Sequence, residues 1–158
     1  MSTEEITQFI GKSGSSRIFE VEKGAIRRFS DAVGDLNPLY RDEEYARNSR
    51  YGSIIAPPGF FGWPLKHPAD AVLLVDSIPE LRIAMENAGF NHLLDGGMEY
   101  EFFLPIRSGD TLVGTPVVAN IRERKGSSGT LVLAWIETTY VNQNGDKVAV
   151  SRETLIFR

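Results

Sequence analysis

The chain has 158 residues, of which 42% are hydrophobic and 24% charged, with no cysteine and a formal net charge of −4. That length fits one domain whose core is large enough to fold without a metal or a disulfide. The lack of cysteine excludes thiolate zinc sites and cysteine nucleophiles. The 17 basic residues are not gathered into one block, which argues against a nucleic-acid partner bound through its phosphates.

Neither a secretory leader nor a membrane segment is predicted. The first nine residues include Glu4 and Glu5 and lack a basic region followed by an apolar one. The longest charge-free run, residues 51–65, contains three prolines and is too short to cross a bilayer. We therefore expect a cytoplasmic protein that does not bind membranes.

The N-terminal part predicts a lead-in and then a strand. Residues 1–16 are polar and contain two glycines, so we expect a flexible lead-in before a single domain over residues 17–158. Residues 17–22 alternate between apolar and polar side chains, which favours a short strand.

Residues 23–33 change to the period of a helix. One face of this predicted helix carries Ile26, Phe29, Ala32 and Val33. Gly34 is the residue type expected just past a helix end. Residues 35–40 predict a turn because an asparagine before a proline disfavours helix, and residues 41–50 predict a short polar helix.

The middle of the chain is apolar but rich in proline and glycine. A surface loop would not carry so many large hydrophobic residues together, so we expect these to be buried: Ile54, Ile55, Phe60, Phe61, Trp63 and Leu65. Proline is tolerated in the first turn of a helix, so we predict a buried helix starting at Pro57 or Pro58. A second helix is predicted over residues 79–88, ending at Gly89.

The C-terminal third predicts strands. Met98, Tyr100 and Phe102 alternate with two glutamates, which indicates a half-buried strand over residues 98–104. Three further strands follow, over residues 111–121, 130–142 and 147–157. Asn144-Gly145 between the last two is a strong hairpin signal, so we predict a four-stranded antiparallel meander.

This order of elements is typical of the α+β class. An antiparallel sheet with one apolar face must cover that face, and residues 54–65 form the only segment of the sequence that is hydrophobic enough to do so. We therefore predict a hot-dog fold, in which a curled antiparallel sheet wraps around a central helix.

The common catalytic signatures are absent from the sequence. There is no glycine-rich phosphate loop, nucleophile elbow or zinc-binding His-Glu-x-x-His motif. The two histidines, His67 and His92, have no acidic or histidine partner at ligand spacing. No metal and no organic cofactor are expected.

Residues 29–40, FSDAVGDLNPLY, resemble the hydratase motif of the MaoC-like dehydratases, also called (R)-specific enoyl-CoA hydratases. In that family a helix ends in Gly/Glu-Asp-x-Asn-Pro, followed by an apolar residue and a histidine. Residues 54–58, 101–111 and 154–158 are similar to the N-terminal type of MaoC domain. The resemblance covers residues 17–158, and it implies the hot-dog fold and a CoA or acyl-carrier thioester as ligand.

The resemblance also implies site residues. Asp35, Asn37 and Tyr40 fall on the catalytic motif, with Tyr40 at the position of the family histidine. The substrate-binding positions implied are Ala56, Gly59 and Phe60, where backbone amides would receive the thioester oxygen. Each of these residues also has a structural interpretation, because Asp and Asn side chains commonly bond backbone amides in turns and glycine relieves a crowded backbone.

Tyr40 decides between the functional hypotheses. A histidine can exchange a proton near neutral pH, whereas a tyrosine with a pKa of about 10 is almost wholly protonated. The first hypothesis is therefore a non-catalytic subunit that pairs with a catalytic MaoC subunit. The alternatives are a hydratase that itself uses Asp35, Asn37 and Tyr40, and an acyl-CoA-binding or thioesterase-like hot-dog protein. Because free sheet edges favour pairing between chains, we expect a homodimer or a heterodimer.

Overall fold

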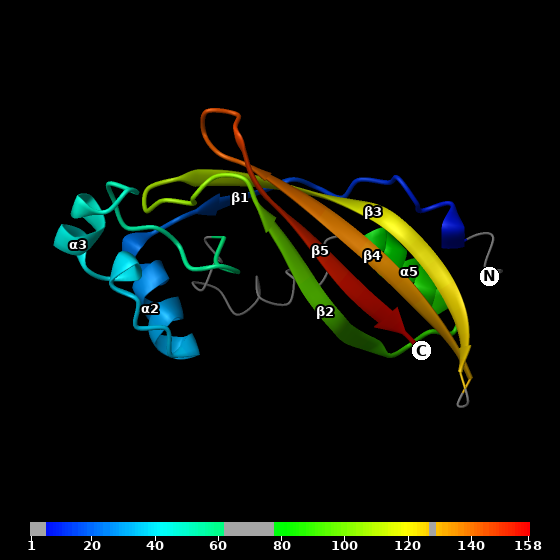
Figure 1. Cartoon of the computed structure of the whole chain (residues 1–158). Helices are drawn as coiled ribbons and strands as arrows, with labels where there is room; N and C mark the ends of the chain where they lie inside the picture. Colours follow the sequence, from blue (N-terminus) through cyan, green and yellow to red (C-terminus); the bar gives the residue numbers. More distant parts are fainter. Residues whose placement is uncertain (1–5, 62–77, 127–128) are drawn as a thin grey trace.

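The computed structural model describes residues 6–61, 78–126 and 129–158. Its labelled elements are shown in Figure 1 and run in this order: β1 (Arg17–Glu20), α2 (Lys23–Val33), a 3₁₀ turn η1 (Pro38–Tyr40), α3 (Glu43–Asn48), α5 (Pro79–Asn87), β2 (Leu93–Phe102), β3 (Thr111–Gly126), β4 (Gly129–Val141) and β5 (Lys147–Phe157). None of the helices in this described part of the chain is long and apolar enough to cross a membrane.

The five strands form one curled antiparallel sheet in the order β1-β3-β4-β5-β2. The meander of β3, β4 and β5 is confirmed. The predicted fourth member is placed differently, because β2 pairs with β5 at the far edge and not with β3. After β2 the chain hydrogen-bonds to another segment: Ala56 donates to the Ile106 carbonyl, and Ser108 to that of Ile54. This connection carries the chain from the edge strand β2 to β3 on the other side of the sheet.

Helix α2 has the predicted bounds and ends at Gly34, which has a φ of 74°. Its buried face lies nearer the N-terminus than predicted. Ala25, Ile26 and Ser30 are buried, whereas Ala32 and Val33 are exposed, because the first turns of the helix contact the core. The predicted short polar helix is α3, capped by the Asp42 side chain.

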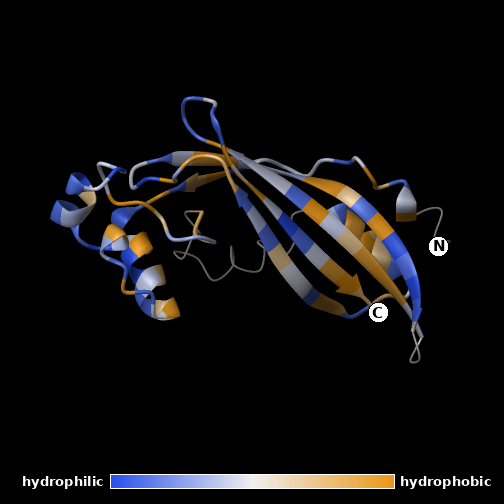
Figure 2. Ribbon diagram, viewed as in Figure 1, coloured by the Kyte–Doolittle hydropathy of each residue, from blue (hydrophilic) through white to orange (hydrophobic). Residues whose placement is uncertain are grey.

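Two groups of buried side chains form the core, and the hydropathy of the ribbon alternates along the strands between them (Figure 2). We call the first group the loop cluster: Phe19, Val21, Ala25, Ile26, Tyr40, Ala46, Ile54, Ile55, Phe60, Phe61, Ile106, Leu112, Val148 and Ala149. We call the second group the helix cluster: Ile6, Phe9, Ile78, Leu81, Ala84, Met85, Val118, Ile121, Val132, Ala134, Ile136, Leu155 and Phe157. The predicted burial of Ile54, Ile55, Phe60 and Phe61 is thus confirmed.

The predicted start of the central helix at Pro57 or Pro58 is wrong. Residues 57–61 form a turn, in which Phe60 donates to the Pro57 carbonyl and Gly59 has a φ of 87°. A left-handed glycine directly after two prolines cannot continue a right-handed helix. The later part of the predicted helix, with Trp63 and Leu65, lies outside the described residues.

Among the described residues, helix α5 packs on the apolar face of the sheet. Leu81, Ala84 and Met85 pack against strands β3, β4 and β5 in the helix cluster, and Figure 1 shows α5 lying across the sheet. The hot-dog fold is therefore confirmed. The predicted helix over residues 79–88 covers part of the apolar face, which the sequence analysis had assigned to residues 54–65 alone.

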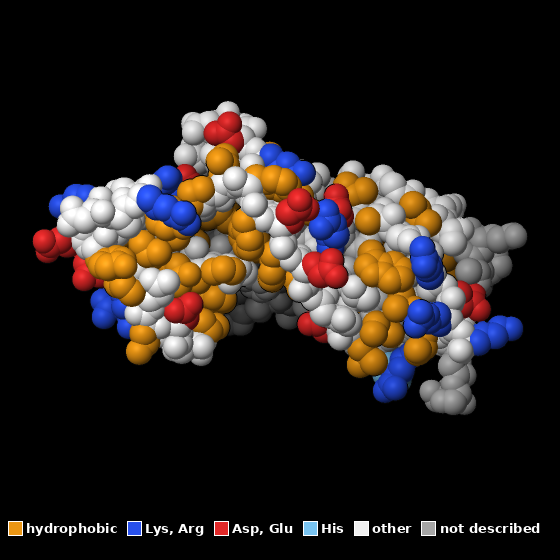
Figure 3. Space-filling view, in the orientation of Figure 1, with side chains coloured by type: hydrophobic (Ala, Val, Ile, Leu, Met, Phe, Trp, Pro, Cys, Tyr) orange, Lys and Arg blue, Asp and Glu red, His pale blue; other side chains and the backbone are white. Residues whose placement is uncertain are grey.

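The two faces of the sheet differ in chemistry. We call the face that carries both apolar clusters the inner face. On the opposite, outer face Arg152 of β5 forms ion pairs with Glu101 and Glu137, and Figure 3 shows charged side chains gathered over the middle of the sheet. The three side chains are about two-fifths to one-half exposed, so this part of the outer face is solvated, and exposed pairs of this kind add little stability.

The two edges of the sheet are also unlike. Beside β3, the short strand β1 is continued by residues 11–14, where Gly11 donates to the Val118 carbonyl and Val118 to that of Lys12. The described part of the expected lead-in is thus packed on the sheet, whereas the division into residues 1–16 and 17–158 stays a prediction. Strand β2 was expected to be half-buried but is exposed along almost its whole length, because it forms the other edge.

Candidate functional site

Asp35 and Asn37 lie between the end of α2 and the start of η1. The Asp35 carboxylate accepts the backbone N–H of Asn37 at 3.1 Å, and the Asn37 side chain accepts that of Leu39 at 3.1 Å. Each side chain therefore bonds the backbone two residues ahead, which is the turn geometry common for Asp and Asn. Asp35 is exposed and Asn37 half-buried.

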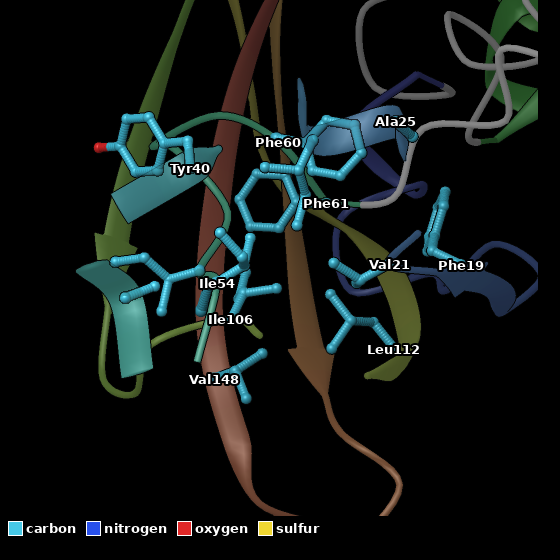
Figure 4. Close-up of a cluster of buried hydrophobic side chains, with 14 residues drawn as sticks. Phe19, Val21, Ala25, Tyr40, Ile54, Phe60, Phe61, Ile106, Leu112 and Val148 are labelled. Atoms are coloured by element: carbon cyan, nitrogen blue, oxygen red, sulfur yellow. The ribbon is translucent and has the colours of Figure 1, made fainter. Parts of the chain in front are cut away.

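Tyr40 is part of the core. Its side chain is 8% exposed within the loop cluster, and in Figure 4 its hydroxyl points away from Phe60 and Phe61. Burial, and then the negative charge of Asp35, raises the pKa of the phenol above its usual value. At neutral pH Tyr40 is consequently protonated and can donate a hydrogen bond but cannot take up a proton.

The segment predicted to bind substrate lies next to this motif. The Ile55 N–H donates to the Leu39 carbonyl at 3.2 Å, which joins the segment to η1. The amides of Ala56 and Phe60 are both bonded internally, to Ile106 and Pro57. Gly59 is the remaining candidate donor, since none of the described residues accepts its N–H. The structure thus brings the two predicted groups of site residues together.

A polar group on the inner face was not predicted from the sequence. It comprises Tyr100 of β2, Tyr140 of β4, and Ser151 and Glu153 of β5. The Ser151 hydroxyl is hydrogen-bonded to Tyr140, and Tyr100 lies directly opposite Ser151 in the sheet. A signal was present: alternate residues of β5 share a face, and Glu153 stands two positions before the apolar Leu155 on the side that the strand buries.

Glu153 has an unusual titration. Burial, with a smaller contribution from the charge of Asp95, raises the pKa of its carboxyl from 4.5 to about 7. The described part of the chain contains no group of His, Cys, Asp or Glu that could hold a metal ion. Glu153 is thus a carboxyl group that is partly protonated at neutral pH without a metal ligand set around it.

This titration predicts a pH-dependent stability. Because the pKa is higher in the folded state, the stability that the neutral carboxyl provides is fully present below 4.5 and is lost as the pH rises to about 7. We expect Glu153→Gln to remove this pH dependence of the free energy of unfolding, so that the variant is more stable than the parent at about pH 8. Urea unfolding across the pH range checks this, and Glu99→Gln on the exposed side of β2 should keep the parental profile.

Comparison with known proteins identifies the family. Residues 8–151 match the model of the FAS1-like dehydratase domain region, which spans most of the chain. The fold is that of a hot-dog protein, and the matching family model is that of a dehydratase domain. The chain belongs to the MaoC-like hot-dog dehydratase family.

Relatives support the same assignment. The chain is 30% identical over 151 residues to a UPF0336 protein of Saccharopolyspora erythraea, covering 95% of this chain and 89% of the relative. It is 29% identical over 136 residues to a probable enoyl-CoA hydratase alpha subunit of Thermomonospora curvata. That match covers 83% of this chain but only 43% of the relative.

Solved structures have the same fold. A MaoC-like dehydratase from Rhodospirillum rubrum has a TM-score of 0.64 at 25% identity, covering 100% of this chain and 97% of the other. The ChsH1-ChsH2 complex from Mycobacterium tuberculosis gives 0.75 at 17% identity, covering 97% and 91%. The HadBC (3R-hydroxyacyl-ACP dehydratase) complex from the same organism gives 0.67 at 19%, covering 94% and 96%.

Proposed function

We propose that the chain is the non-catalytic subunit of a heteromeric hydratase or dehydratase that acts on acyl-CoA or acyl-carrier thioesters. The observation that carries this proposal is Tyr40, a buried and protonated phenol at the position of the family histidine. Hydration of an enoyl thioester needs a base that takes a proton from water and an acid that returns it. Asp35 alone does not supply both, and its carboxylate is already bonded to the Asn37 amide.

The comparisons support a heteromeric assembly. Two of the structures with this fold are complexes of differently named subunits, ChsH1-ChsH2 and HadBC, and one relative is a probable alpha subunit. In such a complex this chain would need no catalytic histidine, because the partner subunit would carry both the aspartate and the histidine of the motif. A cytoplasmic location and a role in fatty-acid metabolism belong to the same proposal.

Strand β2 is the surface that we assign to the partner. Its ten residues pair with β5 on one side, and no other described strand pairs with the opposite side. Free edges of this kind favour pairing with another chain. Large apolar side chains on and just after it are about two-fifths exposed: Leu94, Met98, Tyr100, Phe102, Phe103 and Leu104. Pairing through this edge would bury these side chains and satisfy the outward backbone groups together.

Co-expression tests the assembly. We expect the chain to co-purify with a MaoC-domain protein of its own genome that keeps the Asp-x-Asn-Pro-x-His motif. A lysine at each end of the edge, Leu94→Lys with Leu104→Lys, should weaken the complex about tenfold or more, because lysines on an edge oppose strand pairing. Titration calorimetry or sedimentation measures the dissociation constant.

The matched control places lysines at apolar residues that are equally exposed but lie off this edge. Ile83 and Ile10 are 57% and 44% exposed, and Ile83→Lys with Ile10→Lys should leave the complex intact. A chain that stays monomeric at 17.6 kDa with every such MaoC protein would contradict the proposal. If both pairs of lysines weaken the complex equally, β2 is not the interface.

A further inference from the structure

The inner face of the sheet carries a polar band between the two apolar clusters. Alternate residues of β5 point to one face. Ala149 belongs to the loop cluster, and Leu155 and Phe157 belong to the helix cluster. Ser151 and Glu153 therefore lie on this face between the clusters, at the point where the apolar surface is interrupted.

Neighbouring strands extend the band. Ser151 lies opposite Tyr100 of β2 and Thr138 of β4, and it is hydrogen-bonded to the Tyr140 hydroxyl. Side chains directly opposite each other in an antiparallel sheet are about 5 Å apart at Cβ. Hydroxyl groups from three strands thus gather beside the Glu153 carboxyl.

Glu153 itself has apolar partners in the sheet. It lies opposite Met98 on β2 and Ile136 on β4, and helix α5 presents apolar side chains to this face. The titratable groups that act on the carboxyl and its neighbouring hydroxyls are Asp95 and Tyr100 from β2 and Tyr140 from β4, with Arg17 acting on Tyr140. Among the described residues, the Glu153 carboxyl has neither a cation nor a hydrogen-bond donor as a partner.

The band adjoins the segment implied to receive the thioester. A Cβ placed on Gly59 would lie 3.8 Å from the Tyr100 hydroxyl. Phe61, two residues after Gly59, stacks on Tyr140 with ring centroids 4.3 Å apart and tilts against Tyr100 at 5.4 Å. A ligand whose thioester is held at Gly59 could therefore extend its apolar part over Tyr100 toward Glu153.

We propose that Tyr100, Glu153 and the Tyr140–Ser151 pair form a hydrogen-bonding subsite for an oxygen atom carried on the apolar part of an acyl thioester. This inference rests on the proposed acyl-thioester function. A plain hydrocarbon chain would leave the Tyr100 hydroxyl and the Glu153 carboxyl without partners at a cost in binding, whereas a hydroxyl or ketone at the matching carbon would satisfy them. The ligand class is thus an acyl thioester that carries an oxygen atom beyond carbon 3, the carbon to which a hydratase adds water.

The test compares plain and oxygenated ligands. Calorimetry on the full chain, in the assembly in which it purifies, measures binding of dodecanoyl-CoA and of its hydroxy and keto derivatives that carry the oxygen beyond carbon 3. We expect at least one oxygenated isomer to bind about 3- to 10-fold more tightly than dodecanoyl-CoA. The preference for a ketone, which only accepts hydrogen bonds, should fall as the pH rises through about 7, because an ionised carboxylate cannot donate.

Variants separate the possible outcomes. Glu153→Leu should abolish the preference for the oxygenated ligands, and Glu153→Gln should keep the preference but lose its pH dependence. Glu99→Gln, at an exposed position of β2, is the control and should behave like the parent. If the leucine variant does not fold, the pH dependence of the preference in the glutamine variant still tests the role of Glu153. Equal binding of plain and oxygenated ligands by the parent would overturn the subsite alone, whereas a lack of binding by any acyl-CoA would overturn the proposed function as well.

Discussion

Replacing Phe61 with alanine is expected to lower the free energy of unfolding by about 3–5 kcal/mol, which corresponds to a fall in melting temperature of roughly 6–20 °C. The ring is 2% exposed. It stacks on Tyr140 at 4.3 Å and lies against Phe102 at 5.9 Å. Its loss removes a large buried area and also the contact that holds the turn at residues 57–61 against strands β2 and β4.

An exposed aromatic residue provides the control for this variant. Tyr45 on α3 is 52% exposed, so Tyr45→Ala should cost less than about 1 kcal/mol. Urea or thermal unfolding followed by circular dichroism measures both variants. A loss below about 1 kcal/mol for Phe61→Ala would mean that the turn does not depend on the aromatic stack.

Elements specified by local chemistry were predictable from the sequence. Helix α2 was predicted with the bounds it has, because its apolar residues recur with a helical period and Gly34 ends it in the left-handed conformation. The hairpin at Asn144-Gly145 joins β4 to β5 where expected, and Gly145 has a φ of 83°. In both places a single residue type satisfies a backbone requirement that few others can meet.

Burial in the middle of the chain was predicted correctly, but its conformation was not. Hydrophobicity indicates that Phe60 and Phe61 are inside, and it does not distinguish a helix from a buried turn. The local signal was the sequence Pro57-Pro58-Gly59, in which two residues lack an N–H and the third favours a positive φ. The buried backbone is satisfied instead by bonds from Ala56 to Ile106 and from Ser108 to Ile54, which pair residues far apart in the sequence.

The place of β2 and the role of Glu153 depend on the same long-range arrangement. A strand pattern shows which residues alternate and does not show which neighbour the strand selects, so β2 was predicted beside β3. Only after β5 is flanked by β4 and β2 does its inner face become defined. In the sequence Glu153 is one more charged residue of a strand, and only this arrangement shows that its carboxyl lies on the buried side. Asp35 and Asn37, by contrast, act within two residues of themselves, and their turn bonds could be predicted.

The partner-free chain is expected to hydrate enoyl-CoA esters at least about 100-fold more slowly than a family enzyme with an intact motif. General acid–base assistance is worth about 10²–10⁴ in rate, and loss of one member of a cooperating pair removes most of it. Tyr40 cannot supply the missing base, because burial and the charge of Asp35 raise the pKa of its phenol. The measurement is turnover on a panel of short, long and cyclic enoyl-CoA substrates.

Substitutions at the motif connect this rate to Tyr40. Tyr40→His should raise hydratase activity on some enoyl thioester, and Asp35→Asn in that background should abolish the gain. In the complex with a catalytic subunit, Tyr40→Phe should leave turnover unchanged, since the hydroxyl transfers no proton there, whereas replacing the partner's motif histidine should eliminate it. If the unmodified, partner-free chain turns over any substrate at the efficiency of an intact family enzyme, the partner-subunit proposal is wrong, and the proton must be carried by a group other than an imidazole at position 40.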